Sequence, residues 1–157
     1  MKPARVFAVI GLFLLLAGPS LHAACTSATA AGTFGFTTTG ILILPAPTGP
    51  VPVGAVGSIA FDLNGNAAGS QDRSLGGAFA HETLTGTLTV NRDCTISLLA
   101  NVFDSSGTLV RTSTIDGVLV NNGKQIRGIF ETVVLANGVS LGSVLTVDAN
   151  RVQGHAQ

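Results

Sequence analysis

The chain has 157 residues, equal numbers of basic and acidic residues, and only 10% charged residues in all. Its length suits one domain with a sizeable core and is too short for two. Because there is no basic patch, nucleic-acid binding is not expected.

Residues 1–24 have the features of a secretory signal peptide. Lys2 and Arg5 form a positive n-region, and residues 6–17 form an apolar stretch that is too short for a comfortable membrane span. Small residues at Ala23 and Ala24 predict cleavage after one or the other. We therefore expect an exported, soluble protein, periplasmic or extracellular, with a single domain over 25–157. Its net charge would be −2, because 6 basic residues remain against 8 acidic ones.

Cys25 follows the cleavage region and has two interpretations. A lipid anchor would need an aliphatic residue three places earlier, where the chain has His22. The favoured alternative is a disulfide with Cys94, the only other cysteine, because export leads to an oxidising compartment. Closing a loop of 69 positions would contribute roughly 3–4 kcal/mol in the chain-entropy model.

The rest of the chain is predicted to consist of strands. The stretch Thr83–Leu98 shows the pattern best, since threonines at odd positions alternate with leucines and a valine at even ones. This period of two is typical of a strand with one apolar face.

The proline-rich segment 44–53 is expected to be an exposed connection or an edge. A bulge or break is expected at Asp116-Gly117. Strands are expected at about 33–43, 53–62, 68–79, 81–91, 94–104, 108–115 continuing to 118–120, 124–135 and 142–151.

Short hairpins join most of these strands. Asn64-Gly65 and the segment Asn121–Lys124 are strong two-residue turn signals, because Asn and Gly accept positive φ angles. About eight strands in this arrangement predict an all-β fold, an antiparallel up-and-down barrel, with a β-sandwich as the alternative. The apolar side of the strands would line or fill the lumen; it comprises Phe34, Phe36, Ile59, Phe61, Leu84, Leu88, Val90, Ile96 and Leu98.

Four groups of residues carry a resemblance to a known family. They are Gly32–Phe36 with Gly40, Ala55–Asn66, Thr85–Thr95 and Lys124–Arg127. Together they resemble a family of small exported bacterial proteins of unknown function, which is similar in fold to the allene oxide cyclase and dirigent type of calycin-like barrel. The resemblance implies an eight-stranded barrel over nearly the whole mature chain. It transfers no catalytic residue, since its motifs are strand and turn signatures.

Charged residues within strands are candidates for a polar group in the lumen. Arg111, Arg127 and Glu131 all lie in predicted strands, and the last two share one face. If that face lines the lumen, Arg127 and Glu131 could orient a ligand. If it faces solvent, which is favoured, they are ordinary surface charges. A catalytic alternative would need a carboxylate or a basic group buried within the barrel, and Glu82 and Glu131 are the candidates.

Metal and triad chemistry have weak support, and no cofactor is expected. The segment 62–66 begins like a calcium loop, but Ala67 and Arg73 occupy positions where glycine and a bidentate acid are needed. A triad from Ser113 (or Ser74) with His81 lacks the sequence elbow that would present the serine. A tight turn and ordinary strand residues are the favoured interpretations.

Three functions remain open. The leading hypothesis is a non-enzymatic barrel that binds a small hydrophobic molecule or serves as a scaffold. The second is a cyclase or isomerase acting on a lipid-derived substrate. The third is a structural or adhesive envelope protein acting through its threonine face. An open lumen with a polar group favours the first two, and the sequence does not determine the oligomeric state.

Overall fold

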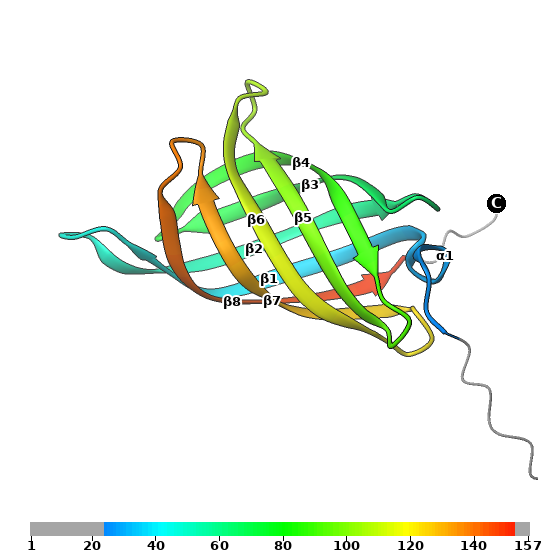
Figure 1. The fold of residues 1–157 in the computed structure, drawn as a ribbon. Coiled ribbons are helices and arrows are strands. Elements are labelled where there is room, and N and C mark those ends of the chain that lie inside the picture. Colours follow the sequence, from blue (N-terminus) through cyan, green and yellow to red (C-terminus); the bar gives the residue numbers. More distant parts are fainter. Residues whose placement is uncertain (1–23, 153–157) are drawn as a thin grey trace, which may run out of the picture.

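A computed structural model describes residues 24–152, and within them eight antiparallel strands form one closed barrel (Figure 1). The strands follow chain order around the barrel, and β8 pairs with β1. The predicted all-β, up-and-down barrel is therefore confirmed, and closure leaves no free sheet edge. The elements are α1 (Ser27–Ala30), β1 (Gly32–Leu44), β2 (Gly49–Phe61), β3 (Asn66–Leu75), β4 (Ala78–Val90), β5 (Thr95–Phe103), β6 (Leu109–Val120), β7 (Gln125–Leu135) and β8 (Ser140–Arg151).

Alternating burial along the strands builds the core. In β4 the leucines at 84 and 88 are buried, whereas the threonines at 83, 85, 87 and 89 are exposed. This arrangement follows from the two-residue period, which sends successive side chains to opposite faces of the sheet. Within residues 24–152, no helix is long and apolar enough to span a membrane.

The proline-rich segment is an exposed connection and edge, as predicted, but β2 begins at Gly49 and not at about residue 53. Only residues 45–48 form the turn, and Pro50 and Pro52 belong to β2 as exposed partners of β1. Pairing of β2 with β3 begins at Val53, so the two prolines lie beyond the end of β3. A missing N–H does little harm on a side where the ladder has ended. β6 continues through Asp116-Gly117 without the predicted bulge or break. The register shifts in its pairing lie elsewhere, between Val102 and Phe103 of the neighbouring β5 and between Thr114 and Ile115 of β6 itself.

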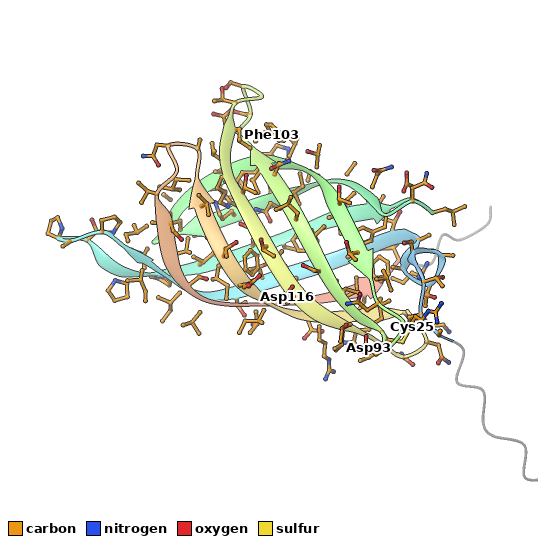
Figure 2. The ribbon with its side chains drawn as sticks, viewed as in Figure 1. Cys25, Asp93, Phe103 and Asp116 are labelled. Atoms are coloured by element: carbon orange, nitrogen blue, oxygen red, sulfur yellow. A yellow bond between two sulfur atoms is a disulfide. The ribbon has the colours of Figure 1, made fainter. Side chains whose placement is uncertain are left out.

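One end of the barrel is covered by α1, whose Ala30 is buried in the core, and the side chain of Arg151 at the end of β8 holds it there (Figure 1). The predicted disulfide between Cys25 and Cys94 is present, with a Cα–Cα distance of 5.0 Å, and it ties the segment before α1 to the β4–β5 turn. Figure 2 shows Cys25 and Asp93 at this end. The Arg151 guanidinium lies 4.8 Å from the ring centroid of the fully buried Phe34. Arg151 also donates hydrogen bonds to the carbonyl oxygens of Thr29, Ala31 and Gly123.

The predicted signal peptide lies almost entirely outside the described residues, which begin at residue 24. A thiol held in a disulfide cannot also carry a lipid, so the Cys25–Cys94 bridge excludes the lipid anchor in this form of the chain.

Candidate ligand-binding lumen

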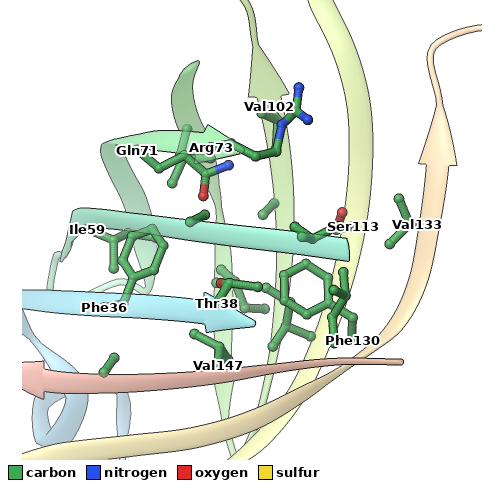
Figure 3. Close-up of a pocket in the computed structure, with 18 of the residues that line it drawn as sticks. Phe36, Thr38, Ile59, Gln71, Arg73, Val102, Ser113, Phe130, Val133 and Val147 are labelled. Carbon is green, nitrogen blue, oxygen red and sulfur yellow. The ribbon is translucent and has the colours of Figure 1, made fainter. Parts of the chain in front are cut away.

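The middle of the barrel contains an apolar chamber of about 80 Å³ (Figure 3). Seven strands line it with mostly aromatic and aliphatic side chains, including Phe36, Ile59 and Phe130, and β3 contributes the polar Gln71 and Arg73. Six of the nine side chains predicted for the lumen line this chamber: Phe36, Ile59, Phe61, Leu84, Ile96 and Leu98. Phe34 and Leu88 are buried in the same core, and Val90 is partly buried against it.

A second hollow, here called the vestibule, lies at the end opposite α1 and has a volume of about 220 Å³. Leu44, Leu75 and Leu135, each at the end of its strand, line it together with Asp104 of the β5–β6 loop. The vestibule and the chamber share three lining residues, Leu42, Arg73 and Arg111. The two hollows are therefore neighbours, with the arginines at their boundary.

Glu82 is the centre of a polar cluster at this boundary. Arg111 donates to both of its oxygens, from Nη1 to Oε1 and from Nη2 to Oε2, each at 2.8 Å. Arg73 Nε donates to Oε1 at 2.8 Å, and Gln71 Nε2 donates to Oε2 at 2.7 Å. The Glu82 carboxylate thus accepts four hydrogen bonds and meets two positive charges.

Burial makes this cluster electrostatically strong. The side chains of Glu82, Arg111 and Arg73 are 3%, 14% and 18% exposed. Burial alone raises the pKa of Glu82, but the hydrogen bonds and charge of Arg111, with the hydrogen bonds of Gln71 and Arg73, lower that pKa to about 2. Glu82 is therefore ionised at neutral pH, as a paired carboxylate in a poorly solvated place must be.

The strand register explains how the cluster forms. Gln71 on β3 is directly opposite Glu82 on β4, and Arg73 is two residues further along the same inward row. Arg111 is on β6, so its side chain passes over β5 to reach Glu82. The sequence pointed to Glu82 and Arg111, but it missed Gln71 and Arg73. Gln71 and Arg73 are at alternate positions with the apolar Leu75, which could have indicated that all three point inward. The glycine and polar residues of that strand made this pattern weak.

Arg127 and Glu131 do not contribute to the lumen. Both are exposed on the outer face of β7, and Arg127 Nε lies 3.8 Å from an oxygen of the exposed Asp148. The alternative in which they line the lumen is therefore wrong, because Ile126, Gly128 and Phe130 take the inward positions.

Ser113 lies in the chamber wall, and its hydroxyl is fully buried without a hydrogen-bond partner among the described residues. It is 1% exposed, and its Oγ makes no hydrogen bond there. His81, its suggested triad partner, points outward, where its Nδ1 lies 2.8 Å from Asp72. Ser113 and His81 are on opposite faces of the barrel wall, so the triad does not form.

The segment 62–66, which begins like a calcium loop, is a tight turn held by hydrogen bonds among its own residues. Asp62 Oδ1 accepts hydrogen bonds from the backbone N–H groups of Asn64 and Asn66, each at 2.8 Å. Asp62 Oδ2 accepts a further bond from the Asn66 side chain at 2.7 Å. These bonds, Asn66 first, lower the pKa of Asp62. The carboxylate thus has a structural role in this turn.

Comparison with known proteins does not show a family for this chain. No known family model and no curated protein sequence matches the chain. Among solved structures, the chain is similar to the crystal structure of Rv2717c from M. tuberculosis, with 11% sequence identity and a TM-score of 0.38. The match covers 80% of this chain and 94% of the other.

Proposed function

We propose that this protein is a non-enzymatic binding protein that holds a small, mostly apolar molecule in its lumen. The observation that carries the proposal is the apolar chamber, which adjoins a wider vestibule and has a polar cluster at their boundary. Ligand sites in proteins commonly combine mostly apolar walls with a few polar groups that orient the ligand. The chamber alone is smaller than the roughly 300–1,000 Å³ of typical pockets, so the ligand would be slender and extend into the vestibule.

The enzymatic alternative has less support. A cyclase or isomerase would need a group that exchanges protons near neutral pH. Glu82 is held as a carboxylate with a pKa of about 2, which makes it a weak base and leaves it no proton to donate. An adhesive role would depend on the exposed threonines of β4 and would not need the lumen.

We also propose that the chain is exported and that its barrel is related to the calycin-like allene oxide cyclase and dirigent type. The Cys25–Cys94 disulfide supports export, because such bonds persist in oxidising compartments. N-terminal sequencing of the protein from its source tests export, with Ala24 or Cys25 as the expected first residue. An intact Met1 would contradict it.

Native mass spectrometry of protein purified from its source tests the binding function. We expect a bound small molecule that Ala55→Leu displaces, because Ala55 lines the chamber and three added carbon atoms would narrow it. The matched control is Ala60→Leu on the same strand, whose side chain is exposed. The proposal fails if no molecule is bound, or if both variants retain it equally.

A further inference from the structure

We propose that the ligand is an amphipathic carboxylate, with its head group at Arg73 and its apolar chain in the chamber. This inference rests on the proposed binding function and specifies the chemical class of the ligand. It is based on two features of the cluster around Glu82: donors of Arg73 that make no hydrogen bond, and two positive charges that face one carboxylate.

The hydrogen bonds of the cluster leave donors on Arg73 unused. Glu82 takes the Nε of Arg73 and both terminal nitrogens of Arg111. The two terminal nitrogens of Arg73 make no hydrogen bond to any residue in 24–152. A guanidinium presents its five N–H groups in a rigid fork that matches a carboxylate. One face of this fork is therefore available to a second anion.

The charges lead to the same conclusion. Two guanidinium groups surround one carboxylate, so the cluster carries a net positive charge in a poorly solvated place. Asp104 also lines the vestibule, but its Oδ1 accepts hydrogen bonds from Ser106 and Thr108 of its own loop. A ligand carboxylate would balance the extra charge, and buried charges in proteins are normally paired.

Ser113 adds an independent indication. It follows Arg111 by two residues, so the two side chains share the inward face of β6. Ser113 lines the chamber only, whereas Arg111 lines both hollows. A buried hydroxyl normally has a hydrogen-bond partner, and the Oγ of Ser113 has none among the described residues. A second polar atom near the head of the ligand would form the hydrogen bond that the Ser113 hydroxyl lacks.

The orientation follows from the walls. The chamber beyond Ser113 is lined by Phe36, Ile59, Leu98 and similar side chains, which suit an alkyl chain. The cationic donors Arg73 and Arg111 line both hollows, and the other polar side chains of the vestibule, Glu82 and Asp104, make it the more polar side of the boundary. The head group therefore belongs at the boundary, and the chain points toward the closed end of the barrel.

Calorimetric titration of the mature protein with decanoate and with n-decanol tests the inference, because the two probes have the same chain length. An apolar cavity without a cation would prefer the alcohol, since burying a charge costs more than burying a hydroxyl. We expect decanoate to bind about tenfold or more tightly than n-decanol, as a charge-assisted pair implies. If both bind equally, or the alcohol binds better, the inference fails and the binding function stands. If neither binds, the proposed function fails as well.

Arg73→Met then locates the head group, and Arg127→Met on the outer face of β7 is the matched control. Arg73→Met leaves Glu82 its two bonds from Arg111 and its bond from Gln71, so the barrel keeps its cluster. We expect Arg73→Met to weaken decanoate binding about tenfold or more and so to remove the preference for decanoate over n-decanol. Arg127→Met should change neither. An unchanged decanoate preference in Arg73→Met would overturn the assignment, and the wild-type comparison does not depend on how either variant folds.

Discussion

Arg111 and Glu82 form a two-point ion pair that joins β6 to β4 over the intervening strand β5, with both N–O distances at 2.8 Å. The two residues are 29 positions apart in the sequence. In an up-and-down barrel each strand pairs only with its neighbours, so most contacts are local in the order of strands. This pair is an exception, and it places two opposite charges in a wall that is mostly apolar.

Replacing Glu82 by Ala should destabilise the fold strongly. The change leaves Arg73 and Arg111 together without an anion, and breaking a buried pair from one side typically costs about 3–5 kcal/mol. The matched control is Glu131→Ala on the outer surface, which should change the free energy of unfolding by less than about 0.5 kcal/mol. Denaturant unfolding measures both, and equal losses would contradict the structural role of Glu82.

Acid should weaken the wild-type protein through the same residue. The pKa of Glu82 is lowered in the folded state from 4.5 to about 2, so the folded protein binds this proton less readily than the unfolded chain. Its contribution, about 3 kcal/mol, is present above pH 4.5 and is lost as the pH falls from 4.5 toward 2. Glu82→Gln should lack this part of the pH dependence. The aspartates of the turns also have lowered pKa values and will remain as a background in both proteins.

Two glycines of β2 should respond differently to alanine. A Cβ at Gly57 would lie 2.2 Å from the Ser70 carbonyl oxygen and 2.8 Å from the Cα of Gln71. A Cβ at Gly54 would meet nothing within 4 Å. Gly57→Ala should therefore force β2 and β3 apart and cost about 1–3 kcal/mol as an overpacked site, and it should disturb Gln71. Gly54→Ala should be tolerated, and similar midpoints of thermal unfolding would refute the difference.

Removing the disulfide should destabilise the barrel by about 2–4 kcal/mol. The test is the double variant Cys25→Ser with Cys94→Ser, compared with the wild type under oxidising and reducing conditions. Reduction should bring the wild type to the stability of the variant. Titration of two free thiols in the untreated protein would show that the bridge is absent.

Ser113→Ala should raise the stability of the ligand-free protein by about 1 kcal/mol, because a buried hydroxyl without a partner is costly to retain. Ser58→Ala is the control, since Ser58 is exposed on β2, and it should have little effect. A loss of stability in Ser113→Ala would mean that the hydroxyl makes a hydrogen bond in solution.

Much of the fold was predictable because it depends on local rules. The alternation in Thr83–Leu98 placed the leucines inside and the threonines outside, and asparagine and glycine signals located the turns. Asn121 and Asn122 adopt φ values of 54° and 56°, as such a turn requires. The start of β2 was predicted too late because the tolerance of Pro50 and Pro52 depends on where β3 ends, which is a property of the neighbouring strand.

The candidate site was less accessible from the sequence. Parity alone offered two faces for Arg127 and Glu131, and only the position of Phe130 in the chamber wall decides between them. Gln71 and Arg73 lie in a strand with few apolar residues, so no clear pattern showed that they point inward. Glu82 follows an exposed His81, which gave no hint that it would meet three partners from other positions of the chain.

The sequence by itself determined the class of fold, the approximate positions of the strands, the inward row of the hairpin Thr83–Leu98 and the pairing of the two cysteines. The period of two and the turn signals are local in the chain, and two cysteines allow only one pairing. Only the tertiary structure decided that Glu82, Arg73 and Arg111 meet. Closure of the barrel brings β3, β4 and β6 around one lumen, and a buried charge can exist there only where the register of each strand supplies its partners.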